Sequence, residues 1–118
     1  MLFDELGTEF ESFGTYIDAA VIGRAPLDIS NITPATIIDS GSSGLMWQID
    51  TVDYRDRGYA YSTTHQSDDD AIDEFTEKTN VKEETVSTLK FDSGIHKNMW
   101  IGNCMAVGNA YGFVGPLH

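Results

Sequence analysis

The sequence predicts an α+β fold: a mostly antiparallel sheet with one or two helices, forming a single domain over residues 1–118. Short apolar runs separated by Gly- and Ser-containing turns are typical of consecutive antiparallel strands. One stretch alone carries the start and stop signals of a helix. A chain of 118 residues with 41% hydrophobic side chains can bury one modest core, which favours one domain over two.

The predicted elements follow one another along the chain without repeats or low-complexity linkers. Residues 1–13 are predicted as a short helix or an irregular lead-in. The predicted strands are residues 16–22, 35–40, 45–52, 59–64, 86–91 and 99–107. The predicted turns are residues 23–26, 41–44, 53–58 and 92–94. Leu45, Trp47 and Ile49 share one face of their strand, because side chains alternate with a period of two.

The one strongly predicted helix begins near Ser67. This serine can cap the first turn, and the carboxylates of Asp68, Asp69 and Asp70 lie where the helix dipole is positive. Ile72 and Phe75 then lie on one face, three residues apart. Asn80 is a plausible stop, because asparagine tolerates the left-handed conformation that ends many helices.

The charge balance is strongly acidic, with 19 acidic residues against seven lysines and arginines and a net charge of -12. Such a surface repels nucleic acid and anionic membranes, so neither is an expected partner. The acid excess is interpreted as either simple solubility or adaptation to high salt, and its spread along the chain favours salt. The single cysteine and the lack of a signal peptide or long apolar run predict a cytoplasmic protein.

Most candidate catalytic or metal-binding groups have a simpler structural interpretation. The three aspartates project about 100° apart on a helix and do not converge on one ion, so no metal site is predicted. His65, His96 and Cys104 lack zinc-ligand spacing, and Cys104 is expected to be a buried, inert thiol within its strand. The serines of residues 41–44 lack the spacing of a nucleophile elbow. No catalytic residue is predicted.

The glycines of residues 108–115 are the remaining candidate for ligand contact. Glycine lets the backbone approach a flat or charged ligand closely. The spacing is not that of a phosphate-binding Gly-x-Gly-x-x-Gly loop, so on spacing alone a tight turn with packing glycines is favoured.

Several segments, taken in order, resemble the tryptophan-halogenase family of flavin-dependent enzymes. Residues 102–117 resemble its Gly-Asn-x-Val-Ala-Leu-Gly-x-Ala-x-Gly-Phe-x-Glu-Pro-Leu stretch. Residues 44–50 fall where the family has Trp-x-Trp-x-Ile-Pro, and residues 58–62 resemble its Gly-Tyr-x-Tyr-Ser strand. Residues 67–71 resemble its Ser-Asp-Asp-Glu-Ala helix start. The order and spacing agree over nearly the whole chain.

This resemblance implies a piece of a two-domain FAD-dependent halogenase or monooxygenase fold, with a small aromatic substrate such as tryptophan and a halide. It implies a substrate-side sheet over residues 16–104 and a flavin-contacting segment over residues 106–117. Trp47 and Ile49 would belong to the wall between the flavin and substrate sites. The implied cofactor-binding residues are Gly108, Asn109, Ala110, Gly112, Phe113 and Pro116.

The chain also departs from the family pattern. The phosphate-binding loop and the region of the catalytic lysine are absent, and His118 stands where the family has Glu. Gly115 replaces another Glu, and Leu45 and Asp50 replace the first Trp and the Pro of the tryptophan motif. We therefore expect a fragment that is inactive alone, or that a partner chain completes. A monooxygenase-like protein and a non-catalytic acidic interaction module are the alternatives.

Overall fold

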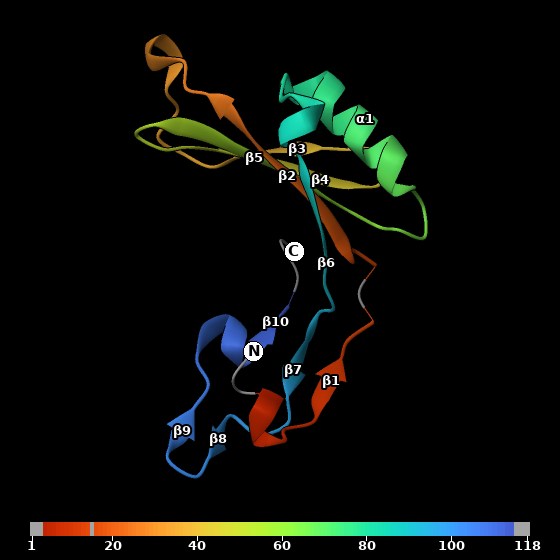
Figure 1. The fold of residues 1–118 in the computed structure, drawn as a ribbon, viewed down its shortest axis with the longest axis vertical. Helices are drawn as coiled ribbons and strands as arrows, with labels where there is room; N and C mark the ends of the chain where they lie inside the picture. The colour runs from red at the N-terminus through yellow and green to blue at the C-terminus, as the bar shows by residue number, and fades with distance from the viewer. Residues whose placement is uncertain (1–3, 15, 115–118) are drawn as a thin grey trace. The chain divides into compact units, whose positions relative to one another are not determined.

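The computed structural model describes residues 4–14 and 16–114 (Figure 1). The chain forms two compact units. The larger unit comprises residues 16–90, and the smaller unit combines the N-terminal 15 residues with residues from 91 onward. The predicted α+β class is confirmed, because the described elements are antiparallel sheets with one α-helix.

The larger unit is built on a five-stranded sheet in the order β3-β4-β5-β2-β6, in which every neighbouring pair is antiparallel. Its strands are β2 (Ala19–Pro26), β3 (Ile37–Ser40), β4 (Gly44–Asp50), β5 (Tyr54–Tyr61) and β6 (Ser87–Lys90). Short 3-10 turns, η2 (Ile29–Asn31) and η3 (Glu83–Thr85), lie in the connections. The predicted turn over residues 41–44 joins β3 to β4, with Ser40 paired to Leu45.

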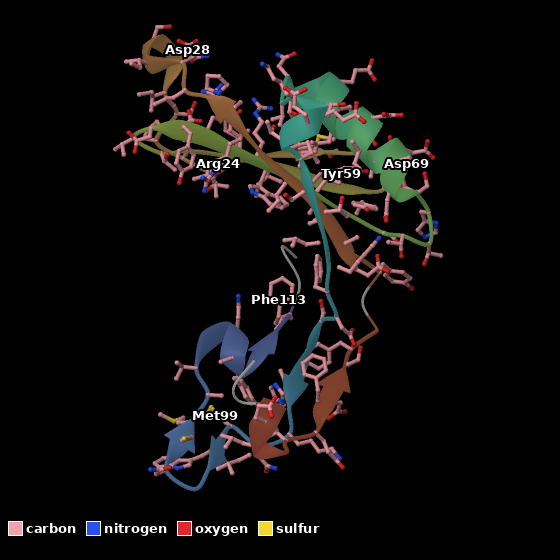
Figure 2. All side chains as sticks on the ribbon, viewed as in Figure 1. Arg24, Asp28, Tyr59, Asp69, Met99 and Phe113 are labelled. Atoms are coloured by element: carbon pink, nitrogen blue, oxygen red, sulfur yellow. The ribbon has the colours of Figure 1, made fainter. Side chains whose placement is uncertain are left out.

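The helix α1 (Asp68–Thr79) covers one face of this sheet (Figure 1). Its fully buried Phe75 packs with Val21 of β2 and with Tyr59 and Tyr61 of β5, and these side chains form the core. Tyr59, labelled in Figure 2, also donates a hydrogen bond to Gln66 Oε1 at 2.6 Å. The core therefore depends on aromatic side chains whose hydroxyl groups find partners at its edge.

The helix boundaries agree with the sequence prediction. Ser67 is the N-cap, and its side chain accepts a hydrogen bond from the backbone N–H of Asp70. Asn80 ends the helix in the left-handed conformation, with φ of 56°. Ile72 packs against the core beside Phe75, as their spacing predicts.

The smaller unit contains a three-stranded antiparallel sheet in the order β1-β7-β10. These strands are β1 (Phe10–Ser12), β7 (Gly94–His96) and β10 (Gly112–Phe113). A separate hairpin consists of β8 (Trp100–Ile101) and β9 (Cys104–Met105), and the 3-10 turns are η1 (Asp4–Leu6) and η4 (Gly108–Ala110). The predicted lead-in thus includes one short turn and one strand.

Two predicted turns are wrong. Residues 23–26 do not end the first strand, because β2 continues through Gly23 to Pro26. The predicted turn over residues 53–58 is mostly strand, because β5 begins at Tyr54. The physical reason is cross-strand charge pairing: Arg24 bonds Asp56, and Asp50 bonds Arg55. The charged residues of these predicted turns therefore lie on strands, where their ion pairs stabilise the sheet.

The predicted strand over residues 99–107 is also wrong. Gly102, with φ of 60°, and Asn103 turn the chain between β8 and β9. A Gly-Asn pair is a standard two-residue hairpin turn. Cys104 consequently lies on an exposed hairpin strand, and the expectation of a buried thiol fails. Among the described residues, no helix is long and apolar enough to cross a membrane.

Candidate functional site

The glycine-rich segment forms one edge of the smaller sheet. Gly108, with φ of 57°, begins η4, and β10 then pairs with β7 so that Gly112 lies opposite Ile95. A Cβ atom at Gly112 would lie 2.5 Å from Ile95 Cγ2 and 2.7 Å from the carbonyl oxygen of Gly94. Glycine is therefore required at residue 112 for the strands to approach. At residue 108 it is favoured by the left-handed backbone.

This edge borders a pocket of about 470 Å³ that lies wholly within the smaller unit. Two ring pairs meet edge to face in its wall. Phe91 and Phe113 have ring centroids 5.4 Å apart, and Phe10 and His96 have centroids 5.3 Å apart. The lining residues are Phe10, Phe91, Asp92, His96, Asn109, Gly112 and Phe113. An aromatic wall of this kind suits a flat apolar ligand.

Three of the six residues predicted to contact a cofactor line this pocket. They are Asn109, Gly112 and Phe113, and Figure 2 labels Phe113 on β10. Gly108 and Ala110 lie in the same short turn, η4, but do not line the pocket. Pro116 lies outside the described residues. Half of the residues predicted to bind the cofactor therefore line one pocket.

The remaining lining residues were missed by sequence reasoning. Phe10 reaches the pocket because β1 pairs with β7, across more than 80 residues of chain. His96 is 3% exposed, and its Nδ1 lies 2.7 Å from the hydroxyl oxygen of Thr8. Nothing local in the sequence signals such a distant pairing. The apolar spacing of residues 1–13 showed only that this stretch would pack somewhere.

The two residues predicted for a substrate-side wall lie on β4 in the larger unit. Met46 and Gln48 are buried toward α1, so the alternation places Trp47 and Ile49 on the opposite face. Ile49 is 42% exposed. A pocket of about 530 Å³ on this unit is lined by Ile22, Gly23, Arg24, Trp47, Ile49, Asp56, Arg57, Thr85 and Ser87. The predicted pair therefore shares one cavity.

Gly58 determines how Trp47 lies on the sheet. The two residues are paired across β4 and β5, and a Cβ at Gly58 would lie 2.0 Å from Trp47 Cζ2. The indole ring therefore occupies the space that a side chain at residue 58 would need. The sequence predicts this glycine as part of a turn, and the structure gives it a packing role on β5 instead.

The end of β4 is held by a buried ion pair. The Asp50 carboxylate, fully buried, accepts hydrogen bonds from Arg55 Nε at 2.6 Å and Nη2 at 2.9 Å, and from the backbone of Thr33 at 2.9 Å. The hydrogen bond from Arg55 is the largest influence that lowers the pKa of Asp50, to about 2. Arg55 also donates to the carbonyl oxygen of Asn31. Asp50 thus fixes both the strand end and the connection from residue 31 to 33.

Searches of known proteins place this arrangement among flavin-dependent halogenase structures. The flavin-dependent halogenase BrvH from Brevundimonas sp. BAL3 superposes with a TM-score of 0.86 at 29% identity, over 97% of this chain and 24% of that one. A tryptophan halogenase from Shewanella frigidimarina NCIMB 400 superposes with a TM-score of 0.85 at 27% identity, over 98% of this chain and 24% of that one.

The family model for tryptophan halogenase matches residues 1–118, and the chain belongs to that family. Among curated relatives, tryptophan 7-halogenase RebH from Lentzea aerocolonigenes is 32% identical over 104 residues. That alignment covers 85% of this chain and 20% of the relative. The chain therefore spans about a fifth to a quarter of the length of the relatives it matches.

Proposed function

We propose that this chain supplies two walls of a flavin-dependent halogenase-like oxidoreductase that acts on an aromatic substrate such as tryptophan. Phe113 and its neighbours would contact the flavin, and Trp47 and Ile49 would face the substrate. Family membership and the names of the matched relatives support this proposal. We infer that the 118 residues do not catalyse halogenation alone, and that their partner in the reaction is the remaining length of such an enzyme. A cytoplasmic location stays a prediction from the single cysteine.

The observation that carries the proposal is the convergence of three predicted cofactor residues on one pocket. The family motif predicts Asn109, Gly112 and Phe113 as cofactor-binding residues, and they line the same cavity as Phe10 and Phe91. The aromatic edges offer contact to the flat ring of a flavin, and the main chain at Gly112 allows close approach. When bound there, the flavin would supply the redox chemistry of the reaction.

The same pocket fits only the ring end of FAD. Among the residues that the structure describes, its lining contains Asp92 and no lysine or arginine, so these offer no counter-charge to a diphosphate. The three-residue turn η4 supplies no helix of the length that binds phosphate. We therefore expect the chain alone to bind FAD weakly or not at all.

A titration of the purified chain with FAD tests this expectation. The intrinsic fluorescence of Trp47 and Trp100 reports binding, and we expect no saturation at micromolar FAD. Saturable binding at micromolar concentration would contradict the inference that the diphosphate site lies elsewhere. Riboflavin, which lacks the diphosphate, is the matched control, and it should bind no worse than FAD.

A chimera tests the role of the chain within an enzyme. Residues 1–118 replace the matching stretch of the Lentzea aerocolonigenes halogenase, and FAD binding and halogenated tryptophan are measured. We expect the chimera to bind FAD, and Phe113→Ala to weaken that binding. Val107→Ala is the matched control, because Val107 is exposed and lies outside the pocket lining. A Phe113→Ala chimera with unchanged FAD affinity would contradict the assignment of Phe113 to the flavin site.

A second function, a non-catalytic acidic interaction module, is favoured by the exposed edges of the larger sheet. The edge strands β3 and β6 are exposed at every residue. Exposed edges can pair with a strand from another protein. Hydrogen exchange distinguishes this function: edge amides that gain protection when a cell extract is added would support it, and a clean monomer with unchanged exchange would count against it.

A further inference from the structure

Arg57 is a partly buried cation that forms no ion pair in the described part of the chain. Two other arginines of the sheet are paired with carboxylates: Arg55 with Asp50 at 2.6 Å, and Arg24 with Asp56 at 3.1 Å. Arg57 donates only through Nη2, to the neutral side-chain oxygen of Gln48. Its Nε is buried and has no acceptor among the described residues. A buried donor left unpaired is costly, so an acceptor from outside the chain is favoured.

A small cavity lies beside this guanidinium. It has a volume of about 150 Å³ and lies between the sheet and the C-terminal end of α1. Its polar lining consists of Arg57, Gln48, Asp39, Lys78 and Thr79, with Trp47 also in the wall. A water molecule occupies about 30 Å³ in the liquid, so the cavity can hold a small ion with one or two waters.

The charges around the cavity favour a single negative charge. Lys78 is already paired with Glu74 at 2.9 Å, whereas Arg57 forms no ion pair among the described residues. Burial is the main cause of the lowered pKa of Arg57, followed by repulsion from Arg55, and attraction to Asp50 acts in the opposite direction. Asp39, which also lines the cavity, disfavours an ion with two or three negative charges.

We propose that the cavity between β4, β5 and the end of α1 binds a small monovalent anion, a halide or a carboxylate, which accepts a hydrogen bond from Arg57 Nε. This site is separate from the aromatic pocket of the smaller unit, and the proposal does not depend on the proposed function. The anion neutralises a partly buried charge and ties β5 to the helix end. Chloride or a free carboxylate such as acetate supplies the same chemistry.

Thermal melts of the full chain test the site. Sodium chloride or sodium acetate is exchanged against sodium methanesulfonate, which is neither a halide nor a carboxylate, at constant ionic strength. A ligand that binds the folded chain raises its melting temperature, so we expect a rise that saturates with anion concentration. The anion that acts at the lower concentration identifies the class. A melting temperature that depends on neither anion would overturn the proposal.

Two charge-matched variants separate binding from general electrostatics. Arg57→Gln removes the buried donor, and Arg24→Gln removes an exposed arginine with the same change in net charge. We expect the saturable rise in melting temperature to disappear in the first variant and to persist in the second. Loss in both variants, or in neither, would overturn the proposal.

A chloride NMR measurement covers the case in which Arg57→Gln does not fold. On the unaltered chain, the chloride resonance should broaden in proportion to protein concentration, and acetate should narrow it. A line width that is independent of protein concentration would overturn the proposal by itself.

Discussion

At the scale of single residues, Asp50 explains how this chain holds the end of β4 at the residue where the family carries proline. A proline would restrict the backbone by itself, whereas Asp50 restricts it through Arg55, Thr33 and Gln48. The charge-assisted bonds to Arg55 are stronger than neutral ones, and they tie the strand to the connection near Asn31. The positions of Trp47 and Ile49, which we propose face the substrate, therefore depend on a titratable group.

Acid should weaken this anchor. The pKa of Asp50 is lowered from 3.8 to about 2, so its contribution to stability is complete above its unfolded pKa. It is lost as the pH falls from about 4 toward 2. Glu74, whose pKa is also lowered to about 2, acts in the same direction. In urea melts over this pH range, we expect the midpoint of Asp50→Asn to fall less steeply with acid than that of the unaltered chain.

The matched control for this prediction is Asp56→Asn. Asp56 forms an exposed pair with Arg24, and such pairs contribute about 0–1 kcal/mol. At neutral pH we expect Asp50→Asn to lower the urea midpoint more than Asp56→Asn does. Equal effects of the two substitutions would show that Asp50 is no more than another surface charge.

Replacing Gly58 should also destabilise the chain, for a steric reason. Replacement by alanine would place a methyl group 2.0 Å from the Trp47 ring, so the indole has to move. Overpacking of this kind costs about 1–3 kcal/mol. We expect Gly58→Ala to lower the free energy of unfolding by that amount and to shift the Trp47 emission maximum in the Trp100→Phe background. Thr64→Ala, at an exposed residue, serves as the control. An unshifted emission spectrum would contradict the close packing.

At the scale of elements, α1 is stabilised at both ends by its own sequence. The Ser67 hydroxyl oxygen accepts the N–H of Asp70 at 3.2 Å, and Asn80 adopts the left-handed conformation. Loss of such a cap typically costs about 1 kcal/mol. We expect Ser67→Ala to lower the free energy of unfolding by this amount, and Ser67→Thr to restore most of it. The comparison requires only urea melts, and equal stability of all three chains would exclude capping.

The contrast between α1 and the strands shows which parts of the fold could be predicted from sequence. The helix signals lie within one stretch, from Ser67 to Asn80, so they could be read directly. The boundaries of β5 depend on partners such as Asp50 and Arg24, which lie on other strands. The pocket could be predicted only in part for the same reason. Asn109, Gly112 and Phe113 belong to a motif, but Phe10 arrives by a distant pairing.

At the scale of the whole molecule, the acidic charge is the feature with the widest effect. A net charge of -12 on 118 residues favours expanded conformations through self-repulsion. Several carboxylates are paired with lysines, including Asp68 with Lys90 at 2.5 Å and Glu74 with Lys78 at 2.9 Å. Seven lysines and arginines cannot neutralise 19 acidic residues, however. Most of the repulsion is therefore reduced only by the solvent and its dissolved ions.

Salt should therefore stabilise the chain, because the screening length falls from about 10 Å at 0.1 M to about 3 Å at 1 M ionic strength. We expect thermal melts to become more cooperative and to shift to higher temperature in molar sodium gluconate. The Arg57→Gln variant is melted beside the unaltered chain, so that general screening is measured apart from anion binding at the cavity. Potassium gluconate is the control for the cation, and sucrose, an uncharged solute that is excluded from protein surfaces, is the control for stabilisation without screening. If molar gluconate leaves the midpoint unchanged, the acidic surface reflects solubility, and adaptation to high salt is the wrong interpretation.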